Sequence, residues 1–222
     1  MLRTGDNSAP AARRTQAQRR EGSERGLVRA AIAVAAERGV SACTFEAIAG
    51  QSGHSRGLVT QRFGSKQRLI EAVIGHLGSR LEEMISENGI DAMTGLDGLM
   101  TWMDVYLRDL SRKGELRAYF MFLSAAVADA TSLRAAFAAE HDRVKERLAG
   151  LVERGQTDAT IRRRIDPTAA ALMIGSLQLG LSMQLLVDPA MDLDPIRETT
   201  LDMLRTSFAA TASETHPGPP RP

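Results

Sequence analysis

The stretch GHSRGLVTQRFGSK, residues 53–66, places two glycine turns around about two helical turns. So short a helix is not a structural unit in its own right, and its neighbours explain it. Upstream, TFEAIAGQSG predicts a second short helix that begins after Thr44 and ends near Gly53. Downstream, Ser65 is placed to cap a longer helix over 66–86. Two short helices joined by a glycine turn predict a helix-turn-helix.

A helical pattern also precedes this motif. Apolar residues recur at i, i+4 and i+7 in the segment 23–38, and the pattern stops at Arg38-Gly39, a pair that suits a helix C-terminus. Residues 1–22 are rich in Arg, Ala and Gln and almost lack large apolar side chains, so we expect a disordered basic arm there. The Pro-rich tail, residues 214–222, is expected to be disordered as well.

The rest of the chain also reads as helical. We expect helices near 94–110, 115–129, 131–154, 167–187 and 195–212. Asp166-Pro167 and Asp194-Pro195 each offer an N-cap acid followed by a proline in the first turn. No segment shows sustained alternation with β-branched residues, so no sheet is expected. The predicted fold class is all-α, with a three-helix domain over 23–66 and a larger helical domain over 67–213.

Charge is divided unevenly along the chain. Residues 1–80 hold 13 Lys and Arg against 6 Asp and Glu, whereas residues 81–222 hold 15 against 21. A basic N-terminal end attracts polyanions, with nucleic acid first and anionic membrane second, although a solvated helix face explains the same excess. No apolar run is expected to reach a membrane-spanning length, and no signal peptide is evident, which predicts a cytoplasmic protein.

The short helix after the glycine turn has the chemistry of a DNA reader. Such a helix fits the major groove, where its first residues reach base edges. Val59 and Phe63 are expected to pack inward against Phe45 and Ile48, which leaves polar residues on the other faces. Arg can hold guanine and Gln can hold adenine, while hydroxyl and ammonium groups near helix N-termini suit phosphates. The residues expected at this surface are Thr44, Ser55, Arg56, Gly57, Thr60, Gln61, Arg62 and Lys66.

Residues 25–77 resemble the N-terminal domain of the TetR family of bacterial transcriptional regulators. The resemblance rests on AERG closing the first helix, Thr44 opening the second, Gly53 at the turn, Ser55-Arg56-Gly57, Phe63, and Gly64-Ser65-Lys66 opening the fourth helix. It implies that Arg56, Gly57, Thr60, Gln61 and Arg62 approach bases or neighbouring phosphates, and that Thr44 and Lys66 contact phosphates. It also implies that the following helices form a ligand-binding and dimerisation domain.

Three positions depart from the family pattern. His54 stands where Val or Ile is usual, Leu58 where Thr is usual, and Thr60 where Tyr is frequent. The loss of that phenol removes a long group that reaches phosphate, so the contacts around Thr60 are expected to differ. His54 permits a pH-sensing hypothesis, but a surface histidine tolerated at a turn is the favoured interpretation.

A regulator of this kind binds a palindromic operator in double-stranded DNA as a homodimer. The helices near 167–187 and 195–212 are the expected dimer interface, because small residues such as Gly175 and Gly180 alternate there with leucines. A purely intramolecular core is the alternative. The resemblance further implies an unknown small-molecule effector that moves the fourth helix, so that the protein is a repressor released by that effector. The candidate pocket residues are Trp102, Tyr106, Tyr119, Phe122, Met173 and Gln184.

Two other classes of function were weighed. An enzyme is disfavoured because GSLQLG at 175–180 lacks the G-x-S-x-G spacing of a nucleophile elbow, and the four histidines show no metal-binding spacing. The single Cys43 excludes an intrachain disulfide and a Cys-rich zinc site, so no metal or cofactor is expected. A membrane-surface module is disfavoured because the basic arm has no apolar residues to insert into lipid.

Overall fold

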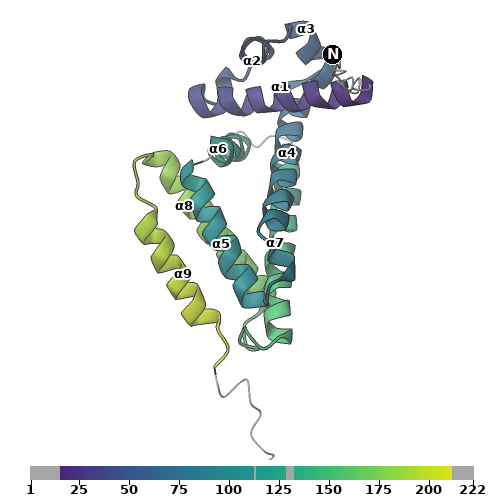
Figure 1. Cartoon of the computed structure of the whole chain (residues 1–222). Helices are drawn as coiled ribbons and strands as arrows, with labels where there is room; N and C mark the ends of the chain where they lie inside the picture. The colour runs from purple at the N-terminus through teal and green to yellow at the C-terminus, as the bar shows by residue number, and fades with distance from the viewer. Residues whose placement is uncertain (1–15, 113, 129–132, 212–222) are drawn as a thin grey trace, which may run out of the picture.

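The computed structural model describes residues 16–112, 114–128 and 133–211, and this part of the chain is built from α-helices (Figure 1). The described helices are α1 (Gln16–Arg38), α2 (Phe45–Ser52), α3 (Arg56–Phe63), α4 (Lys66–Glu87), α5 (Gly95–Arg112), α6 (Gly114–Ala128), α7 (Leu133–Thr157), α8 (Pro167–Val187) and α9 (Asp194–Phe208). Two short 3-10 helices, Val40–Ala42 and Ile90–Ala92, follow α1 and α4. Within the described residues, β-type pairing is limited to an isolated bridge between Ile161 and Ala209.

The helices form a head and a body. Helices α1 to α3 make the head at one end of the molecule, and α4 runs from the head along the body beside α7 (Figure 1). Helices α5, α7 and α8 pack together in the body, α9 packs on α5, and α6 lies between the body and α1. The all-α fold class is therefore confirmed.

The predicted helix starts of the head are confirmed. The side chains of Thr44, Ser55 and Ser65 each accept a hydrogen bond from the backbone N–H three residues later, at 3.1, 3.2 and 3.2 Å. Each of these bonds satisfies a donor that the first helical turn leaves without an intrahelical partner. Asp166 caps α8 in the same way, with 2.7 Å from its Oδ1 to the backbone nitrogen of Ala169.

The predicted cap of α9 is wrong. The helix begins at Asp194, and its N-cap residue, Leu193, makes no side-chain capping bond. The backbone N–H of Asp194 instead donates to Oδ1 of Asp192 at 3.0 Å. The carboxylate that accepts a hydrogen bond at the start of α9 is thus that of Asp192, two residues upstream. Pro195 follows within the first turn of the helix.

The start of α1 also differs from the prediction. The helix begins at Gln16 rather than at Ser23, so residues 16–22 of the predicted disordered arm are helical. Gln, Arg and Glu are good helix formers, and Glu21 pairs with Arg25 one turn later at 3.7 Å. Residues 1–15 and the predicted tail at 214–222 lie outside the described part of the chain.

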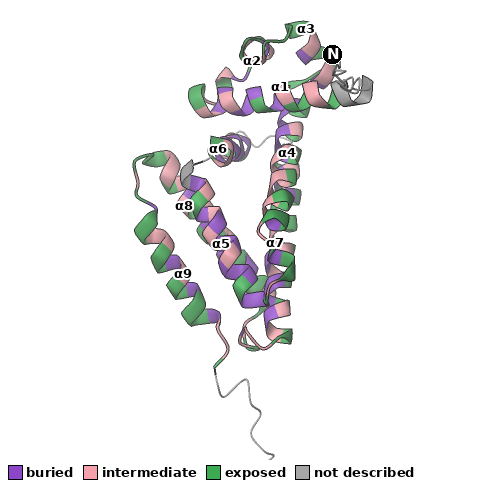
Figure 2. Cartoon of the chain, viewed as in Figure 1, coloured by how far each residue is buried: buried purple, intermediate pink, exposed green. Residues whose placement is uncertain are grey.

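Two hydrophobic clusters hold the molecule together. The first joins the head to the first half of α4, to α6 and to the start of α7, and it includes the fully buried Leu27, Ile48 and Val59. The second fills the body around Trp102 and Leu148. Buried residues gather along α5 and exposed ones along α9 (Figure 2). The head is therefore packed on α6 as well as joined to α4, so it shares its core with the body.

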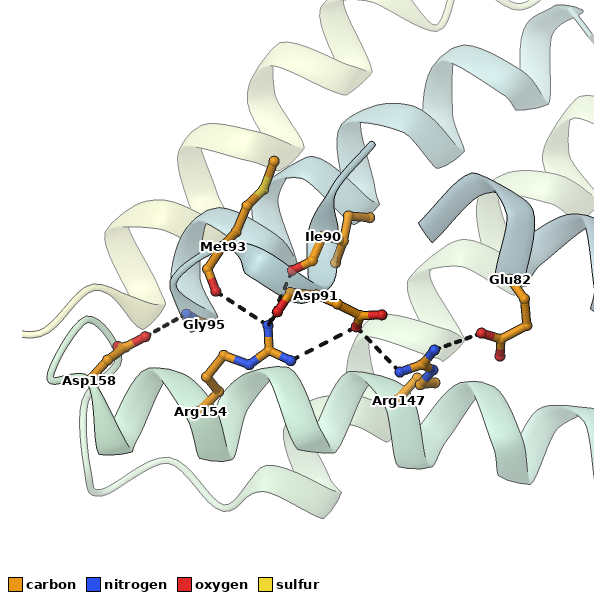
Figure 3. Close-up of polar contacts among 8 residues, drawn as sticks. All are labelled: Glu82, Ile90, Asp91, Met93, Gly95, Arg147, Arg154 and Asp158. Atoms are coloured by element: carbon orange, nitrogen blue, oxygen red, sulfur yellow. Dashed lines mark hydrogen bonds and ion pairs between the residues drawn. The ribbon is translucent and has the colours of Figure 1, made fainter. Parts of the chain in front are cut away.

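The C-terminal end of α4 is fastened to α7 by two arginines (Figure 3). One guanidinium nitrogen of Arg154 lies 3.0–3.3 Å from three backbone carbonyl oxygens of the 90–93 turn, which connects α4 to α5. Arg147 donates to Glu82 at 2.6 Å and to Asp91 at 3.4 Å. These contacts fix the turn at the end of α4 furthest from the head.

Helix α8 contradicts one expectation from the sequence. Its 21 residues include no charged side chain, and by length and composition alone it could cross a membrane. The expectation that no apolar run reaches that length is therefore wrong. The same composition occurs in the core helices of soluble proteins, yet only 28% of the apolar window of α8 is buried within this chain. Most of the helix is thus left for water or for a partner to cover.

Candidate DNA-binding surface and ligand cavity

The head presents α3 on a rigid support. Gly53 ends α2 in the left-handed region, with φ 70° and ψ 17°, where a residue with a β-carbon would be strained. Val59 and Phe63 of α3 are buried against Ile48 of α2, as the sequence predicts, and Phe45 packs on the same cluster. The inward face of α3 is thereby locked, and its other faces are left to solvent.

Most of the predicted DNA-contacting residues are exposed on the head or at the start of α4. The exposed members of the set are Thr44, Ser55, Arg56, Gly57, Thr60, Gln61 and Lys66. They belong to α3 or lie at the N-terminal ends of α2, α3 and α4, where backbone N–H groups favour anions. Thr60 turns its hydroxyl back to the carbonyl of Arg56 at 3.1 Å. The geometry suits a short helix that presents Arg and Gln to base edges.

Arg62 and Lys66 have partners inside the protein. Arg62 is half-buried and donates to the hydroxyl of Ser23 in α1 at 3.4 Å. Its Nε is buried and has no acceptor among the described residues. Lys66 remains exposed, with its ammonium group 3.0 Å from the carbonyl oxygen of Val40. Arg62 therefore braces α3 against α1, whereas Lys66 holds its charge beside the connection between α1 and α2.

A cavity of about 550 Å³ lies in the body between α4, α5, α6, α7 and α8. This volume falls within the range of small-molecule sites. Three of the predicted pocket residues, Trp102, Tyr106 and Tyr119, line it. Residues of α4 between positions 77 and 87 also line the cavity, so the helix that carries the head forms part of the wall.

The other three predicted pocket residues lie elsewhere. Phe122 is buried in the hydrophobic cluster shared with the head. Met173 is 52% exposed and Gln184 is exposed, because both lie on the side of α8 that faces away from the cavity. Composition identified large side chains on the right helices, but it did not reveal which way each helix face points.

The cavity wall carries several polar groups. The hydroxyl of Tyr106 donates to the carbonyl of Gln178 at 3.0 Å and also pairs with the hydroxyl of Ser182. Burial raises the pKa of Tyr106, and the hydrogen bond from Ser182 only partly offsets it. Burial likewise raises the pKa of Tyr119, with a further rise from the charge of Glu140. Both phenols are thus neutral at physiological pH.

The charged residues of the wall were not predicted from the sequence, and one of them is buried. Glu140 lines the cavity although it is only 5% exposed. It lies on the same stripe of α7 as the buried Phe137, Leu148 and Leu151. Its position could have been noticed in the sequence, because Glu140 interrupts the apolar stripe of a helix and buried acids are rare unless they have a partner. His141 also lines the cavity, and burial lowers its pKa.

The head and the body both match known regulator sequences. Residues 27–73 match the profile of bacterial regulatory proteins of the tetR family, and residues 96–209 match the C-terminal profile of BetI-type transcriptional repressors. The chain belongs to the TetR family of transcriptional regulators. The second match covers just over half of the chain, so membership does not rest on the helix-turn-helix alone.

Individual relatives agree with this assignment. An HTH-type transcriptional repressor of Mycobacterium tuberculosis is 37% identical over 73 residues, which are 33% of this chain and 39% of the repressor. The match thus spans well under two thirds of the curated relative's length. The structure of a TetR-family regulator from Rhodococcus sp. superposes with a TM-score of 0.73 at 22% identity, over 84% of this chain and all of that one. The SmeT–triclosan complex superposes with a TM-score of 0.70 at 24% identity, over 90% and 98% of the two chains.

Proposed function

We propose that this TetR-family regulator is a homodimeric repressor that leaves a palindromic DNA operator when a small molecule occupies the body cavity. The exposed surface around Arg56, Gln61 and Lys66 is the part that binds DNA. Arg56 and Gln61 read base edges, while Thr44 and Lys66 hold phosphates. Such a protein acts on genomic DNA and therefore works in the bacterial cytoplasm.

The path of α4 is the observation that carries the proposal. The helix begins at Lys66, directly after the turn that ends α3, and its second half lines the cavity at Leu77, Leu81 and Met84. One rigid element therefore touches both sites. A ligand that fits one position of α4 better than another shifts the population of DNA-competent molecules by that difference in affinity.

The uncovered side of α8 supports the dimer. Met173 is 52% exposed and Leu177 is 37% exposed, and Met203 of α9 is 63% exposed. Large apolar side chains gathered on two helices favour burial against a second copy of the same surface. A two-fold dimer also matches the symmetry of a palindrome, in which each head reads one half-site.

A solved neighbour supports a small-molecule effector. SmeT has the same fold and is known as a complex with triclosan, an apolar aromatic compound. The cavity of this chain contains aromatic walls of comparable character in Trp102, Tyr106 and Tyr119. The effector of this chain is expected to bind there, between α4 and the rest of the body.

Selection of bound fragments from the genome of the source organism tests the proposal. The purified full chain is expected to enrich a palindromic sequence, and at physiological salt to bind it at least about a thousandfold more tightly than random DNA. A reporter gene behind the selected fragment is expected to be silenced by the protein. Equal affinity for selected and random DNA would contradict the proposal. Activation of the reporter gene by the protein would contradict the proposed role as a repressor.

A further inference from the structure

The cavity wall holds a buried carboxylate whose charge is not balanced by a basic group of the wall. Glu140 of α7 is 5% exposed, and its Oε2 accepts a hydrogen bond from Arg143 at 2.6 Å. Arg143 does not line the cavity, and its side chain is 65% exposed on the outer surface. Among the described residues, Oε1 of Glu140 accepts no hydrogen bond from a side chain or the backbone. A buried acceptor is thus available on the cavity side.

The basic groups of the wall are already occupied by acids. Arg80 pairs with Glu83 and with Glu115. Lys145 pairs with Asp142 at 2.5 Å. Arg108, the second arginine of the wall, lies 2.5 Å from Asp104. An anionic ligand that paired with one of these basic side chains would compete with its carboxylate, whereas a cation at Oε1 of Glu140 would displace no partner of that oxygen.

Glu140 also touches the helix that carries the head. A β-carbon built on Gly78 of α4 would lie 2.8 Å from Oε1 and 3.0 Å from Oε2, so the carboxylate lies directly against this helix and would have to shift if a larger residue replaced the glycine. A ligand group that binds Glu140 therefore lies against α4. Binding at this carboxylate can act directly on the position of the helix.

A buried donor completes the set of polar groups. Trp102 lines the cavity and is 2% exposed, and its indole Nε1 is buried without a hydrogen-bond acceptor among the described residues. An unpaired buried N–H carries a free-energy penalty that an acceptor on a ligand would remove. The rest of the wall near it is apolar, with Leu81 and Val105 among the lining residues.

We infer that the effector is an amphipathic molecule with a protonated amine that donates an N–H to Glu140, an aromatic or aliphatic body, and a hydrogen-bond acceptor for Trp102. This inference rests on the proposed effector function of the cavity. The N–H is required because Oε1 of Glu140 is the hydrogen-bond acceptor left available, and a protonated amine can donate to it whereas a quaternary ammonium group cannot. Glu140 thereby determines which ligands the regulator senses.

Isothermal titration calorimetry on the full chain tests the inference with three small molecules that share a phenoxyalkyl body and differ in their charged group. Phenoxybutylamine carries the amine and an ether acceptor, its N,N,N-trimethyl derivative lacks the N–H, and phenoxybutanoic acid reverses the charge. The amine is expected to bind at least about tenfold more tightly than either analogue. Trp102 is the single tryptophan of the chain, so quenching of its fluorescence by the amine locates the site.

Matched variants assign the effect to one carboxylate. Glu140→Gln keeps the shape of the side chain and is expected to weaken amine binding at least about tenfold, with circular dichroism unchanged. Glu153→Gln, at an exposed position of the same helix, is expected to leave the Kd of the amine unchanged. Absence of amine binding, equal binding of an analogue, or wild-type affinity in Glu140→Gln would each overturn the inference. The proposed function is tested by a different result, because it requires selective binding to an operator whichever ligand fills the cavity.

Discussion

Gly95, at the first turn of α5, lies directly against the backbone of Gly155 in α7. A β-carbon added to Gly95 would lie 2.0 Å from the nitrogen of Gly155 and 2.4 Å from the carbonyl oxygen of Leu151. Side chains can move aside, but backbone atoms inside a helix cannot do so without disturbing its hydrogen bonds. The absence of a β-carbon at Gly95 therefore allows α5 to approach α7 this closely, and both helices enclose the cavity.

Gly95→Ala is expected to lower the free energy of unfolding by about 3 kcal/mol, because α5 must move away from α7 to admit the methyl group. Urea denaturation at one fixed protein concentration measures the change. Gly150→Ala in α7 is the control, since a β-carbon there meets nothing within 4 Å. That change is expected to raise the stability by up to about 1 kcal/mol. Equal stability of the two variants would show that the close contact does not constrain the fold.

The arginine contacts in Figure 3 predict a second contrast in stability. Arg154→Ala removes the donor shared by carbonyls of the 90–93 turn, which is expected to lower the free energy of unfolding by about 2 kcal/mol. Arg147→Ala removes only exposed ion pairs, so the expected loss is within about 1 kcal/mol. Chemical denaturation of both variants checks the order. A larger loss in Arg147→Ala would contradict it.

Asp158 predicts a pH dependence of stability. Burial alone would raise the pKa of its carboxyl group, but hydrogen bonds from Thr160 and from the backbone of Gly95, together with the charge of Arg154, hold it below its usual value. A lowered pKa in the folded state stabilises the fold above the unfolded value of about 3.9, and this stabilisation is lost as pH falls through the lowered value.

The variant Asp158→Asn removes this linkage. Its free energy of unfolding is expected to lie below that of the parent chain at neutral pH, and the gap is expected to narrow as the pH falls below about 4. Denaturation curves at a series of pH values measure the gap. A gap that stays constant down to about pH 3 would show that the carboxylate charge plays no part in the contact with Gly95.

Local signals predicted the head well because its helices depend on neighbouring residues. The caps at Thr44, Ser55 and Ser65 each bind a backbone N–H three residues later. The four-residue spacing of Val59 and Phe63 indicates the buried face of α3. Arg62 was harder to place, because its contact with Ser23 joins residues 39 positions apart. The sequence pattern carries no information about a pairing of that kind.

The cavity was predicted only in part for the same physical reason. Trp102, Tyr106 and Tyr119 were found from side-chain size alone. Glu140 escaped notice because its significance depends on the absence of a β-carbon at Gly78, 62 residues earlier on another helix. Met173 was misplaced because α8 is apolar on nearly every side, so its composition did not separate the inner face from the outer one.

The outer face of α8 predicts the assembly state. Met173→Glu places a charge in the middle of the proposed dimer surface, and desolvation of that charge is expected to shift the protein to monomers at micromolar concentration. Val127→Glu is the matched control, because Val127 is 55% exposed but belongs to α6, which is not one of the two helices of the proposed interface. Sedimentation equilibrium distinguishes the two species. A monomeric parent chain, or dissociation by both variants alike, would contradict the proposed interface.

The exposed head predicts two kinds of DNA-binding defect. Arg56 is exposed at the start of α3, so Arg56→Ala is expected to weaken operator binding by about 1–3 kcal/mol and to relax the preference at one base pair. Lys66→Ala is expected to weaken binding to all DNA sequences alike. It is also expected to reduce the slope of log K against the logarithm of the salt concentration by about one unit. Fluorescence anisotropy with operator and random duplexes over a range of salt separates the two effects. Equal loss of discrimination in both variants would refute the assignment of Arg56 to bases and Lys66 to phosphates.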